Sequence, residues 1–330
     1  MPMGVSLFGY IRSLPEDNIN MASSGMKGIN PEGNGIENVE DLVSRLYGVK
    51  SNNVMITPSG TFASFFTLFY LRKKIRRMIT ITPEYPVFYY QAKELGYEVE
   101  IENRLTDDGI ELSPWDVEEN AAYFLSNPNN PSGLIWSDES LRSIARETEG
   151  NDSYLIVDDT FSFFTSTFSK KMDIGNNIMI GSMSKFFGDS GIKMGWIVAR
   201  DSIIQEMSEM MDIIVPDISL AVRRRAHYLL SNMEMYKDYN TKKLKANYAV
   251  LKENLGDYLI DSPAQIINAL YVNENSLKFS QSLLKEGVSS IPGIFFGSDN
   301  IIRICIGTEE QERIERGAKI ISRKLVNGKQ

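Results

Sequence analysis

The stretch Ile178-Met-Ile-Gly-Ser-Met-Ser-Lys185-Phe-Phe-Gly188 sets a lysine among serine and glycine residues, directly after a short apolar run. The apolar residues predict a buried strand that ends just before the lysine. A lysine at a strand end is suited to lie in a cleft, where burial lowers the pKa of its amine and frees it to form an imine. Taken alone, this stretch fits a surface lysine in a Ser/Gly turn equally well.

On both sides of this stretch, short β-branched runs alternate with helical patterns. We expect strands at residues 54–57, 78–82, 97–102, 122–126, 154–158, 178–181 and 196–199. We expect helices at residues 39–47, 60–71, 88–95 and 139–147, the last capped by Ser137. This alternation predicts an α/β fold in which helices cover both faces of a mostly parallel, mixed sheet. Ligands bind at the carboxyl ends of the strands in such sheets.

The remaining segments predict how the chain is divided into domains. Residues 1–35 lack periodicity and are interpreted as an N-terminal arm that belongs with the small domain, and residues 36–225 as the large domain. Residues 219–255 contain few helix-breaking residues, and this stretch predicts one long helix that ends at Gly256. We expect residues 226–330 to comprise an interdomain helix and a smaller C-terminal α/β domain, whose last helix spans about 309–325 behind a Thr308 cap.

The composition excludes several classes of protein. A hydrophobic content of 42% and a charged content of 24% are typical of a globular protein. The net charge of −8 argues against a nucleic-acid surface. With Cys305 and His227 as the single cysteine and the single histidine, we expect no disulfide framework, no metal site and no catalytic role for His227. We find neither a signal-peptide pattern nor a long apolar run, so we expect a cytoplasmic protein without a membrane partner.

Three more predicted strands end in polar residues that could face a ligand. The apolar run Leu155-Ile-Val-Asp-Asp159 ends in two carboxylates, and a carboxylate there can keep a ligand's ring nitrogen protonated. The turn Ser126-Asn-Pro-Asn-Asn-Pro-Ser-Gly133 contains two rigid Asn-Pro steps. The turn Thr57-Pro-Ser-Gly-Thr61 precedes a helix, whose N–H groups can bind an anion. Each turn is common by itself, and their joint occurrence in this order is the specific feature.

These motifs together resemble the fold-type I, pyridoxal-5′-phosphate (PLP)-dependent aminotransferases of class I/II, from about Asn20 to the C-terminal helix. The resemblance implies that Lys185 forms the internal aldimine with PLP and that Asp158 pairs with the pyridine nitrogen. It also implies that Tyr85 stacks on the ring as part of the catalytic site, and that Asn130 binds the ring O3′. The phosphate cup that it implies consists of Ser59, Gly60, Thr61 and Ser182.

The resemblance also indicates where an amino acid substrate binds. Arg303, in Ile302-Arg-Ile-Cys305, matches the arginine that binds the substrate α-carboxylate, with Asn130 beside it. The arm segment Met21-Ala-Ser-Ser-Gly-Met26 is similar to that of the histidinol-phosphate aminotransferase branch, and Gly25 is its candidate substrate contact. An aspartate or an aromatic amino acid donor remains open.

Three positions differ from the family pattern. Phe161 stands where a tyrosine usually binds O3′. Without the hydrogen bond from that tyrosine, we expect the pKa of the aldimine to be raised. Lys193 replaces the usual arginine on the phosphate and cannot form the paired fork contact. Asn30 replaces a tyrosine that normally reaches the neighbouring subunit's phosphate. These differences weaken contacts to the cofactor.

The resemblance implies transfer of an amino group from an amino acid to a 2-oxo acid, with Lys185 moving the proton. It also implies a homodimer. Two alternatives remain open. One is a PLP-dependent lyase or decarboxylase on the same fold, which needs the same lysine and ring-nitrogen acid. The other is a catalytically weak relative with a binding role, suggested by the three differences, although such a protein has no need of Lys185, Asp158, Asn130 and Arg303 together.

Overall fold

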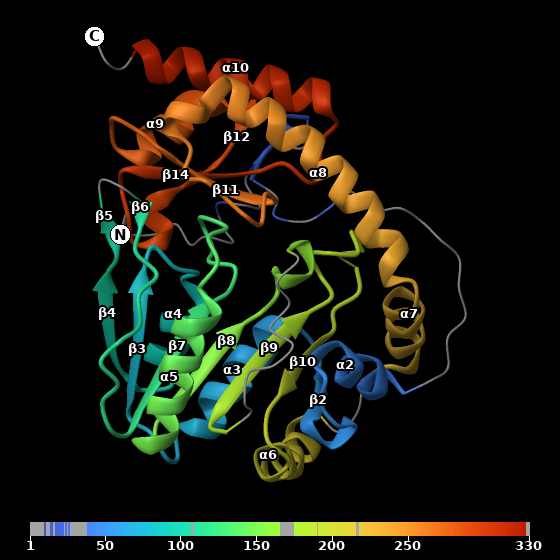
Figure 1. The fold of residues 1–330 in the computed structure, drawn as a ribbon. Coiled ribbons are helices and arrows are strands. Elements are labelled where there is room, and N and C mark those ends of the chain that lie inside the picture. Colours follow the sequence, from blue (N-terminus) through green and yellow to red (C-terminus); the bar gives the residue numbers. More distant parts are fainter. Residues whose placement is uncertain are drawn as a thin grey trace.

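The alternation of strands and helices is present in the computed structural model, which describes residues 10, 14–15, 17–22, 24, 26, 38–106, 109–165, 175–189, 191–215 and 218–327. Its larger part contains a seven-stranded sheet, and its smaller part lies against the upper end of this sheet (Figure 1). In spatial order the strands are β2 (Val54–Thr57), β10 (Gly195–Val198), β9 (Asn177–Ser182), β8 (Tyr154–Asp158), β7 (Ala121–Ser126), β3 (Arg77–Thr82) and β4 (Glu98–Asn103). Strand β10 is antiparallel to both of its neighbours, and the other pairs are parallel. The expected mixed, mostly parallel sheet is therefore confirmed.

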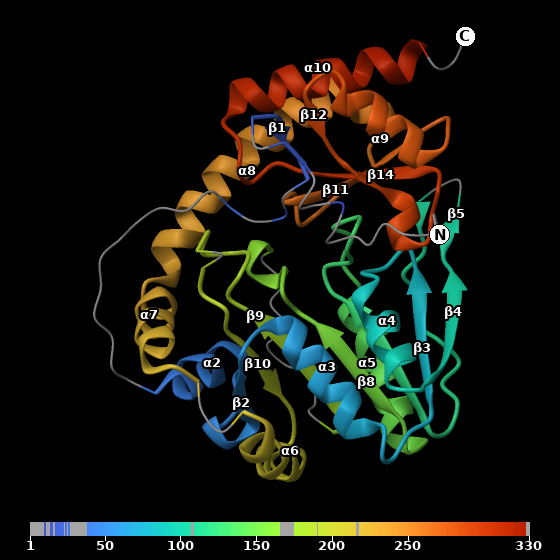
Figure 2. The same cartoon turned by 180° about the vertical axis from the view of Figure 1, so that it is seen from behind.

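Helices cover both faces of this sheet (Figures 1 and 2) because its strands are apolar on both sides. In β8, Leu155 and Val157 point to one face and Ile156 points to the other. The first face packs against α2 (Val39–Tyr47), α5 (Asp138–Gly150) and α7 (Leu220–Ser231). The second face packs against α3 (Gly60–Leu71), α4 (Val87–Glu94) and α6 (Asp201–Ile214).

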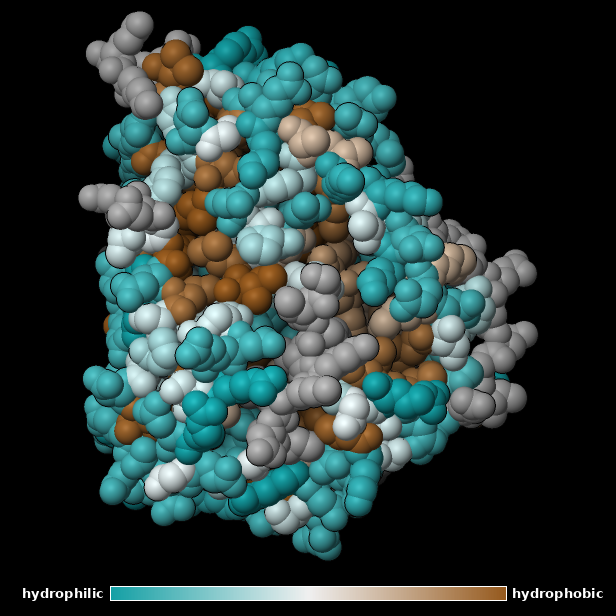
Figure 3. Space-filling model, viewed as in Figure 1, coloured by the Kyte–Doolittle hydropathy of each residue, from teal (hydrophilic) through white to brown (hydrophobic). Residues whose placement is uncertain are grey.

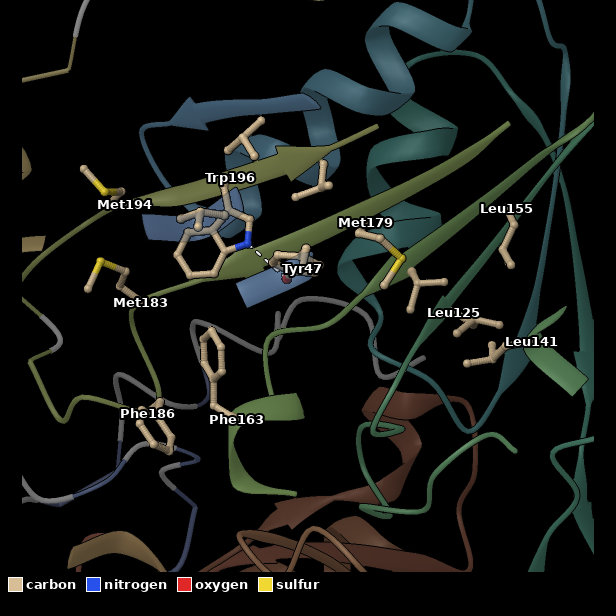
Figure 4. Packing of buried hydrophobic residues seen from close by; sticks show 14 of the residues in the cluster. Tyr47, Leu125, Leu141, Leu155, Phe163, Met179, Met183, Phe186, Met194 and Trp196 are labelled. Atoms are coloured by element: carbon tan, nitrogen blue, oxygen red, sulfur yellow. Dashed lines mark hydrogen bonds between the residues drawn. The ribbon is translucent and has the colours of Figure 1, made fainter. Parts of the chain in front are cut away.

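Aromatic, leucine and methionine side chains pack together on the first face (Figure 4). Trp196 is fully buried, and its indole N–H donates to the Tyr47 hydroxyl at 3.0 Å. Phe163 packs against Trp196 and Phe186 at centroid distances of 6.0 and 5.4 Å. Because Phe186 directly follows Lys185, this packing fixes the turn that carries the lysine.

The smaller part is a three-stranded antiparallel sheet with helices on one side. Its strands are β11 (Ile267–Tyr271), β14 (Ile301–Cys305) and β13 (Ile291–Pro292), and its helices are α8 (Met233–Leu255), α9 (Ser276–Leu284) and α10 (Gln311–Asn327). A short arm strand, β1 (Ile19–Asn20), pairs in parallel with β12 (Val288–Ser289). The short remaining elements are β5 (Leu105–Thr106), β6 (Gly109–Ile110), η1 (Ser51–Asn53), η2 (Ser162–Phe164), η3 (Gly256–Tyr258) and η4 (Gly293–Phe296).

The prediction of one helix over residues 219–255 is wrong. The chain leaves helical geometry at Asn232, which separates α7 from α8. The Asn232 side-chain amide donates to the carbonyl of Tyr228 at 2.8 Å. An asparagine that binds a backbone carbonyl of the preceding turn competes with the helical hydrogen bonds, so the helix ends there.

The expected Thr308 cap is also wrong, because α10 begins at Gln311. The Thr308 hydroxyl donates instead to the carbonyl of Asn20 at 3.1 Å. The threonine therefore holds the N-terminal arm against the small sheet. By contrast, Ser137 caps α5 as expected and accepts a hydrogen bond from the Ser140 N–H at 3.0 Å. Within the described ranges, no helix has the length and apolar character needed to cross a membrane.

Candidate active site

A cavity of about 300 Å³ opens at the carboxyl ends of the large sheet, beneath the smaller part. The carboxyl ends of β8 and β9 supply Asp158, Ser182 and Lys185 to its wall. Strand β14 supplies Arg303 from the opposite side. Residues far apart in the sequence thus meet in one cavity, as expected for a site at the strand ends.

Lys185 lies in the turn after β9 with its amine in the cavity. The N–H of Met26 donates to the Lys185 carbonyl at 3.2 Å, so the arm holds the backbone of this turn. Burial lowers the pKa of Lys185 to about 8, and the positive charge of Arg303 acts in the same direction. A lysine with a lowered pKa has a larger fraction of neutral, nucleophilic amine near neutral pH.

Asp158 is the last residue of β8, and it faces the same cavity as Lys185. One carboxylate oxygen, Oδ1, accepts a hydrogen bond from the Thr160 N–H at 3.0 Å. Burial raises the pKa of Asp158, whereas hydrogen bonding from Thr160 and the positive charge of Lys185 lower it. A cation placed against this carboxylate would favour its charged form.

Two aromatic residues line the cavity on different elements. Tyr85 follows β3 in the turn before α4, and its ring packs edge-on against Phe88 at 5.4 Å between centroids. Phe161 is buried just after β8. Phe161 brings no hydroxyl to this wall, so the hydrogen bond that a tyrosine would offer there is missing.

The start of α3 is built to hold an anion. Ser59 caps the helix by accepting a hydrogen bond from the Phe62 N–H at 3.0 Å. A Cβ on Gly60 would lie 2.8 Å from the Cβ of Ser182, so only glycine lets the helix start approach the end of β9 this closely. Gly60 and Thr61 at the helix N-terminus line the cavity, as do Ser182 and Lys193. These donors suit a phosphate group and fit the 5′-phosphate of PLP.

Arg303 joins three parts of the chain at the far side of the cavity. It is 4% exposed, and its guanidinium donates to Asn130 Oδ1 at 3.1 Å and to the Ala22 carbonyl at 2.9 Å. Within the described part of the chain, its Nε–H has no hydrogen-bond partner. A buried guanidinium with an unused donor on the cavity wall suits a carboxylate ligand.

The structure brings together every predicted site residue that it describes, and Gly25 and Asn30 lie outside the described residues. The cavity wall also contains polar residues to which the sequence analysis gave no role: Ser24, Ser64, Ser126, Thr160 and Ser184. Most of these lie within a few residues of a predicted site residue, and that proximity was the available signal. His227 lies on α7, outside the cavity wall. Among the described residues, no group of three or more His, Cys, Asp or Glu side chains is arranged to hold a metal ion.

Comparison with known proteins identifies a family and relatives for this chain. Residues 11–321 match the family model of aminotransferase class I and II. An aspartate aminotransferase of Thermococcus kodakarensis is 21% identical over 95% of this chain and 85% of its own length. A histidinol-phosphate aminotransferase of a Hydrogenobaculum species is 24% identical over 83% of this chain and 78% of its own.

A solved structure has the same fold. The crystal structure of aspartate aminotransferase from Thermotoga maritima superposes with a TM-score of 0.81 at 17% identity, covering 94% of this chain and 92% of that one. The family model spans nearly the whole chain. The chain therefore belongs to the class I and II aminotransferases, which are PLP-dependent enzymes of fold type I.

Proposed function

We propose that this aminotransferase carries PLP on Lys185 and moves an amino group between an amino acid and a 2-oxo acid. The observation that supports this most directly is the convergence of Lys185, Asp158, Asn130 and Arg303 on one cavity. Lys185 and Asp158 would bind the cofactor, and Arg303 would bind the substrate carboxylate. An amino acid needs both sets of contacts at once.

PLP, when bound, supplies an electron sink for the bonds at the amino acid Cα. The residues of the chain orient it and move protons. Asp158 holds a proton on the ring nitrogen, and the Lys185 amine moves a proton at the substrate Cα as general acid and base. Asn130 Oδ1 accepts from Arg303, so the amide N–H groups of Asn130 stay available for the ring O3′. Thus one asparagine links the cofactor side of the cavity to the substrate side.

For the substrate, we propose an amino donor of the histidinol phosphate, aspartate or aromatic type. Relatives named for aspartate and for histidinol phosphate match the chain to a similar extent, and this supports two of the three types. Arg303 would bind the α-carboxylate of an aspartate or aromatic donor and of the 2-oxo acid acceptor. Gly25 and Asn130 are the other proposed substrate contacts.

We propose that the protein is a cytoplasmic homodimer whose subunits each comprise an arm (1–35), a large domain (36–225) and an interdomain helix with a small domain (226–330). Separate hydrophobic cores in the larger and the smaller part support this division. Hydrophobic side chains gather across the middle of the face shown in Figure 3, where the two parts meet. Such exposed apolar surface supports an interface with another subunit.

The visible absorption spectrum tests the proposed reaction. The purified protein is mixed with PLP, and histidinol phosphate, L-aspartate and L-phenylalanine are then added one at a time. We expect the band of the lysine-bound cofactor to give way to that of the amine form with one donor, and to return when a 2-oxo acid is added. A band that never changes, with release of carbon dioxide or ammonia, would indicate a lyase instead.

The rate of PLP uptake is expected to rise with pH and to level off above about 8. Only the neutral amine attacks the PLP aldehyde, and the lowered pKa of Lys185 makes that form abundant from about pH 8 upward. Below this value the rate should fall about tenfold for each pH unit, since the neutral fraction falls by that factor. The measurement is the initial rate of band formation at saturating PLP. An inflection near 10, as for a dissolved lysine derivative, would contradict the burial of this amine.

The Phe161→Tyr variant is expected to lower the pKa of the lysine-bound cofactor by roughly one unit, because its hydroxyl can donate to the charged ring oxygen. The measurement is a spectroscopic pH titration of the wild type and the variant. Phe164→Tyr is the matched control. The ring centroid of Phe164 lies 6.2 Å from that of Phe161, but Phe164 does not line the cavity. Identical titrations for the wild type and Phe161→Tyr would show that position 161 does not face the ring oxygen.

A further inference from the structure

Glu84 is a buried carboxylate that the proposed reaction does not use. It lies in the turn after β3, is fully buried, and does not line the cavity. Its backbone N–H donates to the Phe296 carbonyl at 3.2 Å, so this turn is also held against η4 of the smaller part. A buried acid needs hydrogen-bond partners for both oxygens, and the partners of Glu84 come from two different turns.

All recorded partners of the Glu84 carboxylate are donors. Oε1 accepts from the Tyr85 N–H at 2.6 Å and from the Ser126 hydroxyl. Oε2 accepts from the Ser126 N–H at 2.9 Å and from the Asn129 amide at 3.4 Å. Burial raises the pKa of Glu84, and the hydrogen bonds from Ser126 and Tyr85 oppose that rise. Only the charged form can accept from all four groups, so these contacts oppose burial, which still raises the pKa of Glu84 to about 8.

These contacts lead to two sides of the active site. The first reaches the backbone of Tyr85, the proposed stacking residue. The second passes through the Ser126 hydroxyl, which accepts a hydrogen bond from the Asn130 N–H at 2.9 Å. Asn130 in turn accepts from Arg303. A single carboxylate therefore ties the turn after β3 to the turn after β7, and through Asn130 it reaches the proposed carboxylate-binding arginine.

We propose that Glu84 is a positioning residue that fixes Tyr85 relative to Asn130 and, through Asn130, orients Arg303 for the substrate carboxylate. The proposal rests on the cofactor and substrate roles proposed above for these residues. A glutamine at this position retains the shape, but its amide N–H₂ faces donors instead of accepting from them. Whichever oxygen position the amide nitrogen takes, two of the four donors, one of them on Ser126, lose their acceptor while the fold is retained.

The Glu84→Gln variant of the full chain, loaded with PLP, tests this proposal. We expect KM for the amino donor to rise about tenfold with a change in kcat of less than about threefold, because Arg303 is displaced more than Lys185. We also expect a weaker circular dichroism band of the bound cofactor, since Tyr85 no longer holds one ring orientation. Leu141→Ala, a core change in α5 away from the cavity, controls for loss of stability alone. Wild-type KM and a wild-type cofactor band in Glu84→Gln would overturn the proposal.

A double-mutant cycle with Ser126→Ala tests the path, and the Ser126→Ala variant by itself remains informative if Glu84→Gln folds poorly. Ser126→Ala removes the hydroxyl between Glu84 and Asn130, so alone it should also raise KM. If Glu84 acts through this hydroxyl, the double variant is no worse than the more impaired single variant. Additive effects, or an unchanged KM in Ser126→Ala, would overturn the path to Arg303. Failure of the proposed function looks different, because the wild type itself would then show no lysine-dependent band and no amino transfer.

Discussion

The Lys185→Ala variant is expected to lose amino transfer by a factor on the order of 10⁴ or more in kcat/KM. The change removes both the covalent attachment of PLP and the amine that moves the proton at the substrate Cα. The absorption band of the lysine-bound cofactor should vanish as well, even when PLP is bound without a covalent link. Stopped-flow spectra and a coupled assay for the 2-oxo acid product measure the two losses.

Lys193→Ala is the matched control for this variant. Lys193 is another lysine of the same cavity wall, but it is proposed to contact only the phosphate. Its removal should weaken PLP binding and leave the band and most of kcat intact at saturating PLP. If Lys185→Ala kept activity within about tenfold of the wild type, or if both lysines gave the same loss, Lys185 would not be the residue that carries PLP.

Much of the larger part could be predicted from the sequence because its signals are local. The helix 39–47 and the strand 154–158 were predicted with the observed bounds, and the other strands of the central sheet within one residue of them. Apolar runs of strand length and helical periodicity depend on near neighbours only. In the same way, the Ser137 cap needs only the start of its own helix.

Where the prediction was wrong, a more distant or competing partner decided the outcome. Thr308 has the sequence of a helix cap, but its hydroxyl binds the arm at Asn20. Asn232 interrupts an otherwise continuous helical pattern, because its side chain binds the carbonyl of Tyr228. The Thr308 bond depends on tertiary packing, whereas the Asn232 bond is a local alternative to the helical hydrogen bonds.

The candidate site shows the same contrast between local and distant signals. Lys185, Asp158 and Asn130 were identified because each lies at or just after the end of a strand, and parallel strands bring their ends together. The contact of Arg303 with Asn130 depends on how the smaller part docks on the larger one. The four donors around Glu84 come from two separate turns, and no spacing in the sequence indicates their convergence.

The second large effect is expected for Asp158→Asn. An amide cannot hold the ring nitrogen in its charged form, so the electron sink of PLP is weakened while Lys185 can still bind the cofactor. Removal of one group that stabilises charge in the transition state typically lowers kcat by roughly 10²–10³-fold, and we expect a fall of that size. The band of the lysine-bound cofactor should persist, which separates this variant from Lys185→Ala. Steady-state rates with a saturating donor measure the fall.

Asp159→Asn is the control for Asp158→Asn, because the two acids are adjacent and only Asp158 lines the cavity. Burial raises the pKa of Asp159 well above its usual range, so an asparagine there imitates the neutral acid. Its kcat should therefore stay within a few fold of the wild type. Asp158→Glu keeps the charge on a longer side chain and should recover part of the rate. If both asparagine variants lost the same activity, the fall would reflect disturbed packing beneath β8, and the charge of Asp158 would have no special part in the reaction.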